Sequence, residues 1–231
     1  MNMLREGFAE AWRLVSTGDA VVFHALGVSL LCSTLAVLLA ALVAVPYGAW
    51  LGLQRPRGRS AHLFLLRLGL SVPTVVIGLF VYMLLTRRGL LGDLHLLHTL
   101  AAIVVGQTLL AFPLLASLVH GATAALDPVV LESARTLGAG RIGAVRMALG
   151  EVRPALATAF LAAFGRCVTE LGIVLMVGGG LKLETLTLTQ AIQLEISRGE
   201  FGLALAPALL LLVVAALVTL LSMRLERGGR R

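Results

Sequence analysis

Charged residues are scarce in this chain, and their scarcity argues against a water-soluble globular protein. Asp, Glu, Lys and Arg make up 13% of the 231 residues, while apolar residues make up 58%. Soluble domains carry about 25% charged and about 45–50% apolar residues. A chain of this length cannot enclose so much apolar surface in one core surrounded by water, so the composition predicts a membrane protein.

Cysteine is rarer still, with two in the chain. Cys32 and Cys167 each lie inside a long apolar run, and neither has a Cys or His at metal-ligand spacing. We expect both to be small buried hydrophobic side chains, and we expect neither a disulfide nor a metal site.

Aromatic residues make up only 5% of the chain, and they are not interleaved with its basic residues. The formal net charge of +7 alone would be compatible with nucleic acid. Most of the arginines, however, flank apolar runs, as they do beside membrane spans. Single-strand-binding proteins combine a basic groove with stacking aromatics. The pattern therefore favours membrane lipid and predicts no nucleic-acid partner.

Five apolar runs are long enough to cross a bilayer, which takes about 20 mostly apolar residues per helix. They cover approximately residues 22–53, 63–85, 96–119, 154–177 and 203–222. Because the first run exceeds what a perpendicular span needs, we expect it to tilt or to kink near Pro46.

The sequence of residues 1–20 predicts a short amphipathic segment that lies on a membrane face. Their mixed charges, with Arg5 and Glu6 before any long apolar run, are not typical of a cleavable signal peptide, and we expect none.

Positive charge is divided unevenly between the two ends of these runs. The loops after the first and third runs and the C-terminal tail carry more Lys and Arg than the opposite side. Because cytoplasmic loops carry this excess, we expect the N-terminus outside and the C-terminus in the cytoplasm. The sequence thus predicts an all-α membrane protein with about five transmembrane helices. Residues 1–231 would form a single transmembrane domain, with a cytoplasmic loop at about 124–153.

A short polar helix is expected in that loop, within LDPVVLESARTLGAG (126–140). Asp127 can cap its N-terminus, and Pro128 suits its first position. Gly138 can supply the left-handed conformation that ends a helix. A second short helix can follow at about 141–149. On capping alone, this could be an ordinary solvated loop helix.

The stretch ESARTLGAGRIGAVRMALGE resembles the cytoplasmic EAA loop of the permease subunits of ABC importers. Glu132, Ala134 and Gly138 stand at the family's spacing, whereas Ser133 replaces the middle alanine and the last part of the motif is not kept. In that family the loop docks into a separate ATPase subunit. The resemblance therefore implies that Glu132, Ala134 and Gly138 make this contact.

The resemblance also implies that ATP and Mg²⁺ are bound by the partner ATPase. The chain has no G-x-x-x-x-G-K-[ST] phosphate-binding motif. We expect a transporter subunit with no cofactor, catalytic residue or ATPase site of its own.

Three further segments are similar to tungstate-type permeases, with molybdate-type permeases as close relatives. They are GQTLLAFPLLA (106–116), AAFGRCVTELGIVLMVGGG (162–180) and TLTLTQAIQLEISRGEFGLALA (185–206). The chain departs from the family at 178–180, where Gly-Gly-Gly replaces Gly-Gly-Asn, and at Val72-Pro73, where a paired proline is usual.

This resemblance implies a type I ABC-importer permease that works as a homodimer in the cell (inner) membrane. An extracytoplasmic solute-binding protein would dock on its outer side. The outer loop at about 185–199 would form an interfacial lid near that docking surface.

Two charged residues lie within the fourth run. Arg166 and Glu170 are four residues apart and so share one face of a helix. Because a charge at the bilayer centre costs from ~2.5 to more than 10 kcal/mol, such residues are usually paired or functional. The two could form a packing ion pair, or they could line a translocation path for an oxyanion. Gln107 in the third run could add amide donors to that path, or hold two spans together by a hydrogen bond.

We therefore expect the membrane-spanning subunit of an ABC importer for a small oxyanion, with tungstate as the first expectation. Molybdate, sulfate or another small solute are alternatives with the same machinery. A secondary transporter would show inverted repeats, and none is visible. A non-transporting membrane scaffold has no need for an Arg/Glu pair inside the membrane.

Overall fold

Helices make up most of the described part of the chain, residues 2–54, 56–136, 138 and 140–228 of a computed structural model, and no strand occurs there. In chain order they are α1 (Asn2–Thr17), α2 (Ala20–Leu53), α3 (Arg59–Ser71), α4 (Thr74–Leu85), η1 (Gly92–Leu94), α5 (Leu100–Ala124), α6 (Pro128–Thr136), α7 (Arg141–Glu151), α8 (Arg153–Val168), α9 (Gly172–Val177), α10 (Leu188–Ser197) and α11 (Phe201–Gly228). The all-α prediction is confirmed.

Three of the predicted spans are single long helices. α2, α5 and α11 are each long and apolar enough to cross a membrane, and they correspond to the first, third and fifth apolar runs. α2 continues as one helix through Pro46, so the first run is not broken at its proline.

The other two runs are interrupted, where the sequence suggested continuous spans. α3 and α4 meet at an angle of 96°. The bend falls at Val72, whose extended backbone (φ −65°, ψ 129°) follows from the steric effect of the proline after it. In the fourth run, α8 ends at Val168 and α9 begins at Gly172. A second bend, of 74°, lies between α7 and α8. If each of the bent pairs α3–α4 and α7–α8 is counted as one span, the described helices supply up to five spans.

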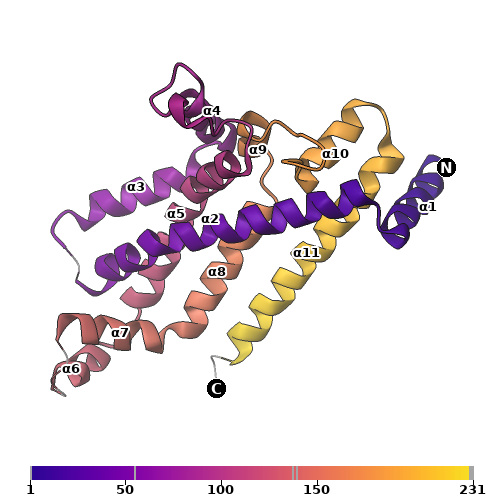
Figure 1. Ribbon diagram of the computed structural model, residues 1–231. Helices are drawn as coiled ribbons and strands as arrows, with labels where there is room; N and C mark the ends of the chain where they lie inside the picture. Colours follow the sequence, from indigo (N-terminus) through magenta and orange to yellow (C-terminus); the bar gives the residue numbers. More distant parts are fainter. Residues whose placement is uncertain (1, 55, 137, 139, 229–231) are drawn as a thin grey trace.

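Small residues allow α2 and α5 to pack side by side along most of their length (Figure 1). A Cβ on Gly48 would lie 2.6 Å from the carbonyl oxygen of Ala116, and a Cβ on Gly52 would overlap the hydroxyl of Thr123. Such close approach of backbones is a usual source of helix association in membranes, where lipid is as apolar as the side chains.

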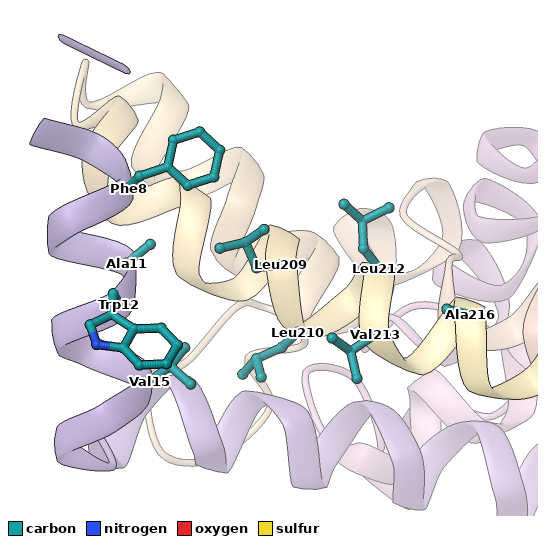
Figure 2. Close-up of a pocket in the computed structure, with 9 residues that line it drawn as sticks. All are labelled: Phe8, Ala11, Trp12, Val15, Leu209, Leu210, Leu212, Val213 and Ala216. Atoms are coloured by element: carbon teal, nitrogen blue, oxygen red, sulfur yellow. The ribbon is translucent and has the colours of Figure 1, made fainter. Parts of the chain in front are cut away.

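α1 packs against the first half of α11, at the end of the bundle opposite α6 and α7 (Figure 1). The two backbones come close at Gly7 and Gly202, where a Cβ on Gly202 would lie 3.6 Å from the Cα of Gly7. Beside this crossing the helices diverge around an apolar groove of about 520 Å³, which Figure 2 shows. Its lining comes from both helices: Phe8, Ala11, Trp12, Val15, Leu209, Leu210, Leu212, Val213 and Ala216. α1 therefore has an apolar side, as expected of an amphipathic helix; its placement on a membrane face stays a prediction.

The packing of α2 on α5 predicts that Gly48→Ala destabilises the protein by about 1–3 kcal/mol, the usual effect of overpacking. The added Cβ would meet the backbone of α5, which cannot move aside as a flexible side chain can. Gly27→Ala on the same helix is the matched control, because nothing lies within 4 Å of its added Cβ. The thermal unfolding midpoint in detergent should fall for Gly48→Ala only. Equal midpoints for the two variants would contradict this packing.

Candidate functional site

The fourth apolar run loses its helical conformation at residues 169–171, between α8 and α9. A break of this kind leaves backbone N–H and C=O groups without intrahelical partners. Within a membrane no water is available to replace them, so protein groups must do so. Side chains of the break itself, of α5 and of α10 make these bonds.

Glu170 lies at the break, and its side chain is only 2% exposed. Its Oε2 accepts a hydrogen bond from Nη1 of Arg166 at 2.7 Å, and its Oε1 accepts one from the backbone N–H of Ile173 at 3.1 Å. The second bond satisfies a free donor in the first turn of α9, where the helix dipole also favours negative charge. The carboxylate therefore pairs with Arg166 and caps α9 at the same time.

Arg166 is much more accessible than its partner. Its side chain is 42% exposed on the single chain. A guanidinium carries five N–H donors, and the hydrogen bond to Glu170 uses one of them. The sequence-predicted pair is thus present, as a buried carboxylate that anchors an exposed guanidinium.

Neutral side chains hold both sides of the break in place. Gln107 on α5 donates from Nε2 to the carbonyl oxygen of Cys167 at 3.0 Å. The Thr189 hydroxyl donates to the carbonyl oxygen of Glu170 at 2.9 Å, and Gln190 Nε2 donates to that of Val174 at 2.9 Å. The interhelical hydrogen bond considered for Gln107 is therefore present, and its acceptor belongs to the residue that follows Arg166. Its contribution to a path stays a prediction.

Thr189 and Gln190 were not among the sequence-predicted site residues. The segment that contains them was expected to be an outer lid, whereas residues 185–191 are buried in the bundle. Thr187 and Gln190 form a capping box at the start of α10. The Thr-x-x-Gln spacing is a recognised helix-start signal and could have placed this helix, although not its hydrogen bonds to the break and to α9.

Arg67 was also missed. It lies within the second predicted span, and its side chain is exposed on α3. A charge inside an apolar run was the signal that could have identified it.

α6 and α7 form a helical hairpin at the same end of the bundle as the C-terminal end of α11 (Figure 1). Asp127 Oδ1 accepts from the N–H of Val129 at 2.9 Å, and Pro128 is the first residue of α6. Gly138 has a φ of +81°. The predicted cap, first position and left-handed stop are all confirmed.

The hairpin presents both polar and apolar groups outward. Glu132 is exposed, and the apolar side chains of Val129 and Ile142 are 59% and 78% exposed. The side chain of Ala134 lies outside the described residues. The hairpin thus carries an unburied apolar surface next to a carboxylate, a combination suited to contact with another protein.

A bundle of apolar helices with a broken, charged span and a projecting hairpin defines a membrane-spanning transport subunit. Residues 44–231 match the family of binding-protein-dependent transport system inner membrane components, and the chain belongs to that family. It is therefore a multi-pass permease subunit of an ABC importer in the inner membrane. The family implies an ATPase and a binding protein as partners.

Relatives cover nearly the whole chain. It is 32% identical over 215 residues to the tungstate uptake system permease protein TupB of Peptoclostridium acidaminophilum, covering 93% of this chain and 94% of the relative. It is 37% identical over 194 residues to a probable anion ABC transporter permease protein of Haloferax volcanii (81% and 84%). It is 28% identical over 215 residues to the molybdenum transport system permease protein ModB of Azotobacter vinelandii (89% and 95%).

A solved structure of the MetNI methionine ABC transporter in an inward-facing conformation has the same fold. Its TM-score is 0.70 at 20% sequence identity, and the match covers 91% of this chain and 97% of that chain. The type I importer fold expected from the sequence is confirmed.

The unequal burial of the ion pair predicts unequal effects of removing each partner. Arg166→Met would leave the buried Glu170 carboxylate without its counter-ion, a change that typically costs about 3–5 kcal/mol. Glu170→Gln would leave a guanidinium that is 42% exposed, and the new side-chain oxygen can still accept from Ile173. The yield of folded protein and its unfolding midpoint should therefore fall further in Arg166→Met. The opposite order would show that the burial of Glu170 does not govern the stability of the pair.

Proposed function

We propose that two copies of this chain form the pore of an importer for a tungstate-like oxyanion, with Arg166 of each copy beside the path. The observation that carries the proposal is the exposed guanidinium of Arg166, held in the broken span by a buried carboxylate. Arginine donors suit tetrahedral oxyanions because they form several charge-assisted hydrogen bonds at once.

The exposure of Arg166 supports a pore between two copies. An arginine side chain that faces hydrocarbon in mid-membrane costs from ~2.5 to more than 10 kcal/mol. A water-filled path removes most of that cost. One chain leaves Arg166 on its surface, so a second copy would enclose the path and bring a second Arg166 to it.

The pairing with Glu170 suits a conduit better than a storage site. The carboxylate cancels much of the positive charge of Arg166, and the remaining N–H donors can still contact a passing anion. A weak interaction of this kind allows release, which conduction requires. In this proposal Gln107 supports the path by holding Cys167, the residue after Arg166, through its backbone.

Tungstate is the substrate best supported, because two relatives that are 32% identical over 93% and 98% of the chain are named tungstate uptake permeases. Molybdate and sulfate are the alternatives, since permeases named for each are also similar to this chain. These anions share a tetrahedral shape and a double negative charge, and both suit hydrogen bonds from an arginine side chain.

The hairpin of α6 and α7 is proposed to transmit the work of ATP hydrolysis. Glu132, Ala134 and Gly138 would contact the ATPase subunit, which binds ATP and Mg²⁺. The support is the projecting hairpin and its outward-facing Glu132 and Ile142. The binding protein would dock at the opposite end, near α10. With this arrangement the N-terminus is outside and the C-terminus is cytoplasmic.

Replacement of Gly138 tests the coupling role. Gly138→Ala places a Cβ at a φ of +81° with nothing within 4 Å, so the change strains the backbone by about 1–2 kcal/mol without a steric clash. Gly140→Ala is the matched control, because Gly140 has an ordinary φ of −65° and equally open space. In the complex reconstituted in vesicles, ATP hydrolysis stimulated by the loaded binding protein should fall in Gly138→Ala and not in Gly140→Ala. Full stimulation of ATP hydrolysis in Gly138→Ala would show that the turn at Gly138 has no role in coupling.

A double variant separates conduction from packing. Arg166→Gln with Glu170→Gln leaves no charge at the break and keeps an acceptor for the N–H of Ile173, so the protein should fold normally. Tungstate uptake per complex should fall about 10- to 100-fold, since a hydrogen bond to a charged group contributes about 1.5–3 kcal/mol. Uptake is measured in vesicles with excess loaded binding protein. Uptake at the parent rate would leave the pair with a packing role only.

A further inference from the structure

The apolar groove between α1 and α11 takes no part in the proposed transport path. It has a volume of about 520 Å³, and all of its lining residues are apolar. Sites that hold one small ligand have volumes of about 300–1,000 Å³. Figure 2 shows Phe8 and Trp12 projecting from α1 toward the side of α11 that carries Leu209 and Val213. The groove therefore has the size and the lining of a binding site for one apolar molecule.

Small residues close the groove at one end. They recur at a four-residue spacing on both helices, as Gly7 and Ala11 on α1 and as Gly202 and Ala206 on α11, a pattern that allows helices in membranes to pack closely. A Cβ on Gly202 would lie 3.6 Å from the Cα of Gly7, and Ala11 and Ala206 belong to one buried apolar cluster. Beyond this contact the two helices diverge (Figure 2). The groove is therefore a wedge that narrows toward the contact.

The helix that forms one wall of the groove faces lipid. Only 17% of the apolar window of α11 is buried, against 50% for α2 and 61% for α5. The groove follows α11 from Leu209 to Ala216, which is about 10 Å along the helix axis. One leaflet of the hydrocarbon core is about 15 Å deep. The groove can therefore accompany a lipid chain through much of one leaflet.

The wedge shape favours an acyl chain over a helix of a second copy. A helix with its side chains is about 10–12 Å wide, which is too wide to reach the narrow end of the wedge. The apolar atoms at that end would then lose their packing contacts. A single acyl chain is thinner and flexible, so it can fill the groove as far as the contact between α1 and α11.

A positive charge lies on the same face of α1 as the groove. Arg5 precedes Phe8 by three residues and Trp12 by seven, so the three side chains share one face of the helix. The side chain of Arg5 is exposed. Gly7, two residues later, contacts the first turn of α11 at Gly202, so Arg5 lies near the start of that span. Arginine side chains near the ends of spans lie along apolar surface and reach lipid headgroups.

We infer that the groove binds one phospholipid, with an acyl chain between α1 and α11 and the phosphate at Arg5. The lipid fills the wedge and holds α1 against α11. Since α11 also packs on α10, which is bonded to the break through Thr189 and Gln190, the site belongs to the frame around the broken span. The inference depends neither on the substrate nor on the position of the pore.

Trp12 can report on its own site, because the chain has only two tryptophans. Trp50 does not line the groove and packs with Tyr47 and His62. The change Trp50→Phe keeps an aromatic ring there and leaves Trp12 as the single tryptophan. The probe is phosphatidylglycerol with bromine in the first half of its acyl chains, since bromine quenches tryptophan fluorescence only at close range. The full chain, freed of native lipid in maltoside detergent, is titrated with this lipid.

Quenching should saturate while detergent is still in large excess over lipid, whereas lipid that merely surrounds the protein quenches in proportion to its fraction in the micelles. Val213→Phe and Ala216→Phe each place a ring in the groove and should abolish the saturating component. Leu217→Phe is the matched control, because it places the same ring at an exposed position of α11 outside the lining. The unfolding midpoint of each variant shows whether it is folded.

The headgroup contact has a test of its own. Arg5→Gln should weaken the apparent affinity for the brominated lipid about fivefold, the usual effect of one basic residue near anionic lipid. Arg224→Gln removes an equal charge from an exposed position toward the other end of α11 and should leave the affinity unchanged. Equal affinities in the two variants would contradict a phosphate at Arg5 and overturn the inference.

Quenching that is only proportional to the lipid fraction would overturn the inference, as would a saturating component that survives both filling variants. Absence of quenching at every lipid fraction would also overturn it, because Trp12 would then be covered by protein, as in a contact with a second copy. No transport is measured, so these outcomes are independent of the uptake test on Arg166 and Glu170.

Discussion

One buried carboxylate stabilises the break between α8 and α9. A helix that breaks inside a membrane exposes donors that lipid cannot satisfy. Glu170 satisfies the N–H of Ile173 with one oxygen and binds Arg166 with the other. The short helix α9 can then pack tightly between its neighbours, since a Cβ on Gly78 of α4 would lie 3.0 Å from the Cα of Ile173, and one on Gly106 of α5 would overlap its side chain. The carboxylate therefore helps to fix both the start of α9 and the position of the guanidinium.

The same break connects the two ends of the molecule. On one side, α8 begins at Arg153, directly after the hairpin helix α7 ends at Glu151. On the other, α10 is bonded to the break through Thr189 and Gln190. A displacement of the hairpin or of α10 would therefore also move the residues that orient Arg166. Coupling across a membrane needs such an element, which can change its arrangement and which both ends can bias.

The features that were predictable from the sequence are those set by local chemistry. Apolar composition alone gives α2, α5 and α11, because a long apolar run has few other stable conformations in a membrane. The caps at Asp127 and Gly138 are equally local. The bend at Val72 had a visible signal in the following proline.

The break at residues 169–171 had no such signal, because no proline or helix-breaking pair stands there. Only tertiary bonds explain it, and those come from residues far along the chain, such as Thr189 on α10. The spacing of Arg166 and Glu170 revealed that the two could pair. It did not reveal that one would be buried and the other exposed, because burial depends on which helices surround the pair.

Electrostatics gives a reason for the weak net charge at the break on the proposed path. A dianion that enters a cell with a negative interior moves against the membrane potential, at a cost of about 5 kcal/mol per 100 mV for two charges. At the break the charge of Arg166 is largely cancelled by Glu170, so the anion is not held there. The energy that moves the anion against the membrane potential must then come from another subunit, and the hairpin proposed to receive the ATPase lies at the end of the bundle opposite α1.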